Sequence, residues 1–243
     1  MSCVVRARVA ATRGTSRLAS SRVKVRVIVH WVTRNRSLAR GERSSHGSAA
    51  MTTDPIRLFL DCRRRAVEAG TGFDGTKAVL ATASPDGVPS ARYVLVKEVG
   101  EDGFFVYTNY ESRKARDLDA NPRAALCVHW AEIGEQFRVQ GRVERASAAR
   151  SDAYFRARPR DSQLGAWASD QSRPIPSRAH LVEKMEQLRA AYEGRDVPRP
   201  PHWGGYRIVP ERIEHWINGD HRLHERFVYE RTADGWRETR LAP

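Results

Sequence analysis

Residues 216–226, W-I-N-G-D-H-R-L-H-E-R, concentrate charged and aromatic side chains that could act on a ligand. If this segment is extended, its alternation places Arg222, His224 and Arg226 on one side. A single histidine is usually a satisfied structural residue. A histidine between two arginines on the same side is better explained by an anionic or electron-rich ligand. Trp216 adds an aromatic surface at the start of the segment.

A second group of polar side chains lies at the start of a predicted helix. Ser112, Arg113 and Lys114 follow a predicted strand whose end includes Tyr107 and Thr108. Because a helix N-terminus presents free backbone N–H groups, a hydroxyl and two cations beside it favour a phosphate ligand. The alternative is a solvated first turn, but cations there oppose the helix dipole unless an anion is bound.

A third group of tyrosine, arginine and serine side chains surrounds a proline, and its members are Tyr154, Arg158, Arg160 and Ser162. Tyr154 and Arg158 are four residues apart and therefore share a face of a predicted helix. Pro159 ends that helix and Ser162 begins the next one. The group could therefore converge on a second anion.

Two further polar groups have structural explanations that are as good or better. The predicted strand over residues 88–99 contains the run Arg92, Tyr93, Val94, Leu95, Val96 and Lys97. Its two cations could serve two ligands, although ordinary strand-end charge is the simpler explanation when the run is taken alone. Gln171 and Ser172 form a polar pair in a loop, where a structural role explains them equally well.

Together these groups indicate two phosphate-bearing ligands and a reaction whose difficult step belongs to a bound cofactor. The sequence offers no acid pair, serine triad or metal-ligand set. Its cysteines, Cys3, Cys62 and Cys127, include no C-x-x-C pair, so a reducing, cytoplasmic compartment is expected. The longest apolar run, residues 25–32, is too short to cross a membrane.

Turn signals and hydrophobic periodicity place these groups on alternating strands and helices. Strands are expected over residues 77–83, 88–99, 104–109, 123–130, 135–144, 205–209, 213–217, 225–231 and 236–241. Helices are expected over residues 55–69, 113–120, 146–157, 162–169 and 177–192. Antiparallel strands with helices inserted between them predict an α+β barrel.

The net charge of +13 arises mostly from the first fifty residues, which hold eleven Lys and Arg against one acid, Glu42. Residues 51–243 carry only +3, so the total does not imply a nucleic-acid-binding face. We interpret residues 1–50 as a disordered or mis-assigned extension, with a transit peptide and a basic nucleic-acid-binding arm as alternatives. The expected functional domain is residues 51–243.

The ordered motifs of the chain resemble those of one flavoenzyme family. They include R-x-V-L-x-K, Y-T-N-x-x-S-R-K, Y-F-x-x-R-P-R-D-S-Q, P-x-x-W-G-G, W-x-x-G-x-H-R-L-H-E-R and a terminal R-L-A-P. This pattern resembles the pyridoxine/pyridoxamine 5'-phosphate oxidases from about Asp54 to Pro243. The resemblance implies a mainly antiparallel, FMN-binding split β-barrel with peripheral helices, forming a homodimer with FMN at the subunit interface.

The resemblance also implies an activity and a set of residues. Pyridoxine or pyridoxamine 5'-phosphate would be oxidised by molecular oxygen to pyridoxal 5'-phosphate, with release of hydrogen peroxide and, from the amine, ammonia. The implied FMN contacts are Arg92, Tyr93, Val94, Leu95, Val96, Lys97, Tyr107, Thr108, Arg113, Lys114, Gln136, Gln171, Ser172, Trp216 and Arg226. The implied substrate-phosphate contacts are Lys97, Tyr154, Arg158 and Ser162. Arg222 and His224 would lie over the substrate ring as positioning and proton-handling residues.

The sequence departs from the family pattern at two places. The family often closes over its substrate with a pair of Arg and Tyr, and residues 36–53 show no such pair because they contain no Tyr. In addition, Trp216 is followed by Ile217, Asn218 and Gly219 where the family often has Q-G. The nearest alternative is an FMN oxidase of phenazine biosynthesis, which is expected to lack the full substrate-phosphate set. A non-catalytic flavin-binding protein is disfavoured because both catalytic candidates are retained.

Overall fold

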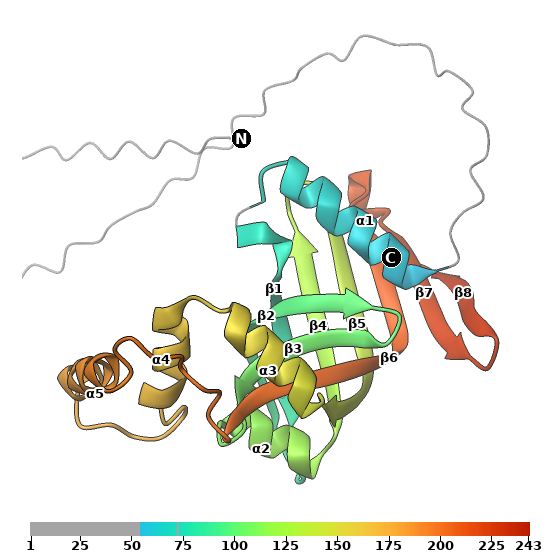
Figure 1. Cartoon of the computed structure of the whole chain (residues 1–243). Helices are drawn as coiled ribbons and strands as arrows, with labels where there is room; N and C mark the ends of the chain where they lie inside the picture. Colours follow the sequence, from blue (N-terminus) through green and yellow to red (C-terminus); the bar gives the residue numbers. More distant parts are fainter. Residues whose placement is uncertain (1–53, 72) are drawn as a thin grey trace, which may run out of the picture. The chain divides into compact units, whose positions relative to one another are not determined.

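The computed structural model describes residues 54–71 and 73–243, so the expectations for residues 1–50 and 36–53 lie outside the described residues. One antiparallel sheet has the strand order β3-β2-β1-β4-β5-β6-β7-β8. The additional pairing of β3 with β6 closes strands β1 to β6 into a barrel (Figure 1). The strands are β1 Lys77–Ala83, β2 Pro89–Gly100, β3 Gly103–Asn109, β4 Arg123–Trp130, β5 Glu135–Arg145, β6 Trp203–Ile217, β7 Glu225–Thr232 and β8 Gly235–Leu241.

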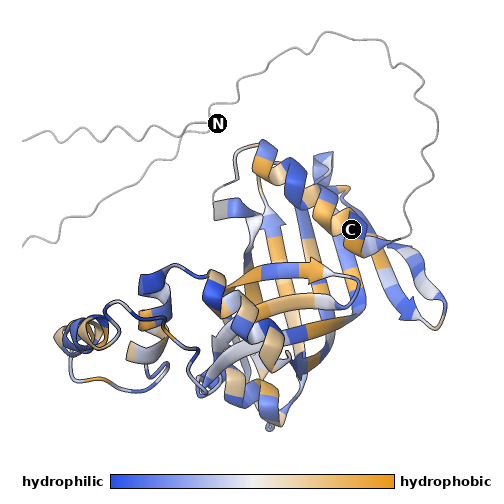
Figure 2. Ribbon diagram, viewed as in Figure 1, coloured by the Kyte–Doolittle hydropathy of each residue, from blue (hydrophilic) through white to orange (hydrophobic). Residues whose placement is uncertain are grey.

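Alternating hydropathy explains why these strands form a barrel with a packed interior. The side chains of β5 alternate between buried and less buried positions along nearly the whole strand. Figure 2 shows the same alternation of hydrophobic and hydrophilic residues along the barrel strands. Because successive side chains of a strand point to opposite faces, one face fills the core and the other remains available for contacts. The expected α+β barrel is therefore confirmed.

Helix α1, Pro55–Glu68, covers one end of the barrel (Figure 1). It begins as the sequence predicts, because the Asp54 carboxylate accepts a hydrogen bond from Ile56 N at 2.9 Å and Pro55 occupies the first helical position. Phe59 is 2% exposed, and its ring lies 5.1 Å from that of Phe104 and 5.2 Å from that of Phe137. This aromatic packing fixes the helix to the barrel core.

The remaining helices are α2 Arg113–Ala120, α3 Ala148–Ala157, α4 Arg160–Ala168 and α5 Arg178–Ala191, with short 3-10 turns η1 Phe73–Gly75 and η2 Asp220–Arg222. A small second core joins α3 and α4 to the start of β6 through Phe155, Leu164 and Trp203. The expected start of α4 at Ser162 is wrong, because the helix begins at Arg160 directly after Pro159. None of the described helices is long and apolar enough to cross a bilayer.

Strand β6 is continuous where the sequence predicted two strands separated at Pro210. Proline cannot donate a ladder hydrogen bond, so a continuous strand needs a local adjustment at this position. The ladder between β5 and β6 shifts register between Gln140 and Gly141, beside Pro210. A Cβ at Gly141 would lie 1.9 Å from Val209 O, so only glycine permits this close approach. The irregularity accommodates the proline, and β6 spans the distance from β3 to β7.

Candidate active site

A cavity of about 770 Å³ lies between strands β2 and β3 and helices α2, α3 and α4. Its wall contains many of the residues that the motifs single out, which come from sequence positions far apart. The members of this set that line the cavity are Tyr93, Val94, Leu95, Lys97, Tyr107, Thr108, Lys114, Tyr154, Arg158, Ser162 and Gln171. The fold therefore assembles the two expected anion-binding groups around one space.

The first anion-binding group is the one at the start of α2, and Lys114 lies at its centre. Its Nζ donates to Gln171 Oε1 at 2.8 Å, to Thr108 Oγ1 at 3.0 Å and to Ser112 Oγ at 3.3 Å. Burial, and then the charge of nearby Arg92, lowers the pKa of Lys114 from 10.5 to about 8. No acidic side chain in the described part of the chain pairs with Lys114. A half-buried cation with only neutral partners is suited to an anionic ligand.

The loop that carries Gln171 and Ser172 is tied to the first turn of α2. Arg113 N donates to Ser172 Oγ at 3.3 Å, and Ser172 has a left-handed backbone with φ of 70°. Arg92 lies behind this group, where it donates to Thr82 Oγ1 at 2.8 Å and to Leu80 O at 3.1 Å. Arg92 also pairs with Asp117 at 3.8 Å, so it is held in a fixed position and its charge is partly offset.

The end of β2 divides its residues between the cavity and the core. Val96 is 2% exposed in the barrel core, and its N–H donates to Thr76 O at 2.8 Å. Val96 therefore offers no side-chain contact to a ligand in the cavity, and its expected contact with FMN stays a prediction. The β2–β3 ladder changes register between Val96 and Glu98, and Lys97 there lines the cavity 3.3 Å from Asp74 Oδ2.

The second anion-binding group contains Arg158, Tyr154 and Ser162. Nη1 of Arg158 is buried and has no hydrogen-bond partner among the described residues. Burial lowers the pKa of Arg158, because desolvation disfavours its charged form. Arg160 is separate from this group, since its guanidinium donates to Tyr192 O and Arg195 O near the end of α5. Arg160 is thus a structural residue, whereas Arg158 retains donors for a ligand.

Tyr107 links the two anion-binding groups, because it precedes Thr108 of the first group and contacts Tyr154 of the second. Its ring stacks on that of Tyr154 with centroids 3.9 Å apart, and its hydroxyl donates to Glu98. Burial and then the hydrogen bond to Glu98 raise the pKa of Tyr107, so its hydroxyl remains a neutral donor. Glu98 also accepts a hydrogen bond from Arg150 at 3.0 Å. Sequence reasoning missed Glu98 and Arg150, because the pairing of β2 with β3 brings Glu98 to Tyr107 and the packing of α3 brings Arg150 to Glu98.

The remaining predicted residues form a separate cluster on β5, β6, β7 and η2. Gln136 is paired with Trp216, and Trp216 with Arg226, across three adjacent strands. The Trp216 and His224 rings are 4.6 Å apart, and His224 Nδ1 accepts a hydrogen bond from Gly219 N at 3.1 Å. These residues are not part of the 770 Å³ cavity wall in one chain.

The expected extended alternation of Arg222, His224 and Arg226 is wrong. Residues Asp220–Arg222 form the turn η2, in which Arg222 has φ of 66°, and β7 begins only at Glu225. Arg226 also has an acidic partner, because its Nη2 lies 2.9 Å from Glu214 Oε1. Glu214 also pairs with Arg138 at 3.2 Å and with Arg212 at 3.5 Å, so three arginines share one carboxylate and the charge of Arg226 is only partly offset.

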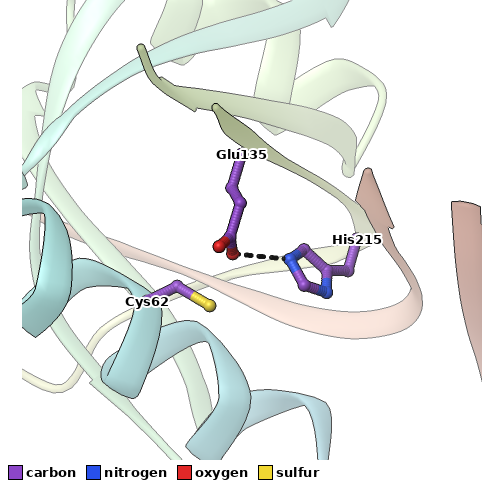
Figure 3. A group of neighbouring side chains, drawn as sticks. All are labelled: Cys62, Glu135 and His215. Carbon is purple, nitrogen blue, oxygen red and sulfur yellow. Dashed lines mark hydrogen bonds and ion pairs between the residues drawn. The ribbon is translucent and has the colours of Figure 1, made fainter. Parts of the chain in front are cut away.

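Residues of α1, β5 and β6 form a buried polar cluster next to the cluster that contains Trp216 (Figure 3). Glu135 Oε2 is 2.8 Å from His215 Nε2, and the Cys62 thiol faces the same carboxylate. Arg65 donates to both oxygens of Glu135, at 2.8 and 3.0 Å, and to Cys62 Sγ at 3.0 Å. Burial, followed by the hydrogen bond and charge of Glu135, raises the pKa of Cys62 to about 12. Because the Arg65 guanidinium supplies the positive charge, the cluster is a satisfied structural network.

Comparison with known proteins identifies the family. The model of "Pyridoxamine 5'-phosphate oxidase" matches residues 75–192, and "Pyridoxine 5'-phosphate oxidase C-terminal dimerisation region" matches residues 203–243. The pyridoxine/pyridoxamine 5'-phosphate oxidase of Rubrobacter xylanophilus is 53% identical over 190 residues, covering 78% of this chain and 87% of the relative. The chain belongs to the pyridoxine/pyridoxamine 5'-phosphate oxidase family. The pyridoxine/pyridoxamine 5'-phosphate oxidase of Anaeromyxobacter dehalogenans is also 53% identical, covering 78% of this chain and 96% of the relative.

Solved structures share this fold. PhzG from Burkholderia lata, in complex with tetrahydrophenazine-1-carboxylic acid, has a TM-score of 0.75 and 30% identity, covering 80% of this chain and 95% of that one. A pyridoxamine 5'-phosphate oxidase-related, FMN-binding protein from Nostoc punctiforme has a TM-score of 0.61 at 18% identity, covering 78% and 98%. The split-barrel fold is thereby confirmed, and the matched C-terminal dimerisation region indicates that this oxidase family member is a homodimer.

Proposed function

We propose that this protein oxidises pyridoxine 5'-phosphate and pyridoxamine 5'-phosphate to pyridoxal 5'-phosphate with FMN and molecular oxygen. One hydrogen peroxide is released per turnover, and the amine substrate also consumes one water and releases ammonia. The active unit would be residues 51–243, with residues 1–50 as an extension. The observation that carries the proposal is the buried Nη1 of Arg158, beside Tyr154 and Ser162, which has no hydrogen-bond partner within residues 54–71 and 73–243.

The second anion-binding group supports a phosphorylated substrate. Buried N–H donors without partners are rare and costly, so an unpaired Arg158 Nη1 is best explained by a ligand that accepts from it. Tyr154, Ser162 and Lys97 line the same cavity and add two hydroxyl donors and a cation. An arginine fork with hydroxyl donors matches the oxygens of a phosphate ester.

The first anion-binding group supports FMN as the cofactor. Lys114 has a lowered pKa and no acidic partner in the part of the chain that the structure describes, and it lies at the N-terminus of α2, where backbone N–H groups favour a phosphate. These residues fit the phosphate of FMN, with Thr108, Gln171 and Ser172 as hydroxyl and amide partners. Bound FMN would supply the two-electron acceptor that the described side chains lack. The protein's own task is to bind both ligands side by side and orient them.

The cluster on β5, β6 and β7 supports a site shared between two subunits. Gln136, Trp216 and Arg226 form one row across the sheet, apart from the cavity of their own chain. In a homodimer, the equivalent row of the partner subunit would complete the FMN site. His224 would handle protons at Nε2, because its Nδ1 accepts from Gly219 N and a neutral ring then carries its proton on Nε2. Arg222, beside it in η2, would orient the substrate.

The proposal is tested with the full chain purified from cells. The protein should be yellow, and FMN should be released on denaturation in about one copy per chain. Oxygen uptake and pyridoxal 5'-phosphate formation are then measured separately with the two phosphorylated substrates. Absence of FMN, or no turnover with either substrate, would overturn the proposal.

A second candidate function follows from the resemblance to PhzG, whose structure contains tetrahydrophenazine-1-carboxylic acid. An FMN oxidase of that kind would use the same cofactor but would not need a site for a substrate phosphate. Oxygen uptake with a reduced phenazine carboxylic acid, compared with pyridoxine 5'-phosphate and unphosphorylated pyridoxine, separates the two functions. A preference for the phosphorylated over the unphosphorylated vitamin supports the first.

A further inference from the structure

Trp203, the first residue of β6, lies in the cavity wall at the centre of an aromatic group. It is 6% exposed. Its ring is nearly parallel to that of Tyr107, at 11° and 5.8 Å between centroids, and to that of Tyr154, at 6° and 6.2 Å. The guanidinium carbon of Arg158 lies 4.6 Å from the centroid of the Trp203 ring. Trp203 thus lies beside Tyr107 and beside two members of the second anion-binding group, Tyr154 and Arg158.

The aromatic contacts of Arg158 replace the acidic partner that a half-buried arginine usually has. No carboxylate among the described residues forms an ion pair with Arg158, and its next aromatic contact, Phe155, is more distant at 5.6 Å. An acidic partner would hold the guanidinium but would occupy its N–H groups and repel a phosphate. An aromatic ring attracts the cation through its face, and the N–H donors, which lie in the guanidinium plane, remain available.

The backbone of Trp203 is held in place independently of any ligand. Its carbonyl accepts a hydrogen bond from Arg199 Nη1 at 2.6 Å, and Arg199 Nε is 2.6 Å from Asp152 Oδ1. The following glycine, Gly204, lies directly against the Tyr110 side chain, because a Cβ added there would lie 2.1 Å from the Tyr110 hydroxyl. The indole is therefore a fixed platform, and no reorganisation is required when a ligand arrives.

We propose that Trp203 is a positioning residue for substrate recognition. Its indole face holds the Arg158 guanidinium by a cation–π contact, which leaves the N–H donors of Arg158 for the phosphate ester of the substrate. This inference rests on the proposed function and deepens it, because it assigns phosphate recognition to a pair, Arg158 with Trp203, rather than to the arginine alone.

The test compares Trp203→Leu and Trp203→Phe in the full-length holoenzyme. Loss of the platform in Trp203→Leu should raise the KM for pyridoxine 5'-phosphate about tenfold, while kcat changes less than threefold and FMN content is unchanged. Trp203→Phe, which retains an aromatic face, should recover most of the affinity. The matched control is Trp236→Leu, because the Trp236 ring also carries an arginine, Arg231 at 5.0 Å, away from the cavity. This control should leave KM unchanged.

Two further measurements separate positioning from general damage. In an Arg158→Ala background, Trp203→Leu should raise KM by less than twofold, because the contact it removes is already absent. The affinity for inorganic phosphate, measured by calorimetry, should fall in Trp203→Leu as much as KM rises. This binding measurement needs no turnover, so it tests the pair even if the proposed reaction fails. Unchanged KM and phosphate affinity, an undiminished effect without Arg158, or parallel loss of FMN would overturn the inference.

Discussion

The lowered pKa of Lys114 predicts that FMN affinity depends on pH in the mildly alkaline range. A phosphate dianion favours the charged form of this lysine, whose pKa in the ligand-free protein is about 8. The charged fraction falls from about nine-tenths at pH 7 to about one-tenth at pH 9. Above pH 8, binding must therefore take up a proton, and the dissociation constant of FMN should rise about tenfold between pH 7 and pH 9.

The assay is a titration of FMN-free protein followed by flavin fluorescence at several pH values. Lys114→Arg should bind FMN with little change over this range, because arginine remains charged. Lys114→Met should bind weakly at every pH. Lys184→Met is the matched control, because Lys184 lies on α5 and pairs with Asp170 at 3.1 Å. A constant affinity in the native protein, or an equal rise in Lys114→Arg, would refute the reasoning.

The same pKa has a defined consequence for the stability of the FMN-free protein. The folded pKa of Lys114, about 8, lies below its ordinary value of 10.5. Between these values the unfolded chain binds a proton that the folded chain does not. Below pH 8 the folded protein therefore bears the full cost of burying the charged lysine. As the pH rises from 8 toward 10.5 this cost is relieved, so the contribution of Lys114 makes the free energy of unfolding increase across that window.

Three further perturbations follow from the site and its buried support. Arg158→Ala should raise the KM for pyridoxine 5'-phosphate about 100-fold while FMN content stays within twofold, and equal loss of both would contradict the assigned role. Glu135→Gln should lower the free energy of unfolding in urea by about 2 kcal/mol, since Arg65 loses its charged partner. The control Glu68→Gln, at the exposed pair of Glu68 with Arg64, should change that free energy by less than about 0.5 kcal/mol. Burial, which outweighs the hydrogen bond to Glu135, lowers the pKa of His215 below 6.5. The unfolded chain then gains a proton first on acidification, so stability falls below about pH 6.5, and His215→Phe should reduce that slope between pH 7.5 and 5.5.

Elements with local signals could be predicted from the sequence. The start of α1 follows from Asp54 and Pro55, and the start of α2 follows from Ser112, whose hydroxyl accepts from Ala115 N. The continuity of β6 across Pro210 could not be predicted, because the irregularity that accommodates proline belongs to its pairing with β5. The turn η2 was also missed, since alternating residue types indicate a strand even where the backbone is turned.

The candidate site was identified by residue type, but its assembly depends on tertiary structure. Lys114 and Gln171 are 57 positions apart, and no local pattern predicts that their side chains meet at 2.8 Å. The separation of the cavity from the row that contains Trp216 is likewise a result of strand order. Motif resemblance named these residues, whereas the contact of Trp203 with Arg158 became visible only in the fold.

The position of β6 in the barrel has a consequence for how the chain is made on the ribosome. Strand β3 ends at Asn109, but its barrel-closing partner β6 begins only at Trp203. At about 5–20 residues per second, translation leaves these two segments separated by roughly 5–20 s. During that interval the edges of β3 and β5 lack the strand that later covers both, and such edges are prone to pair with other chains. A nascent chain stalled before Trp203 should therefore aggregate, whereas one extended past Ile217 has all six barrel strands.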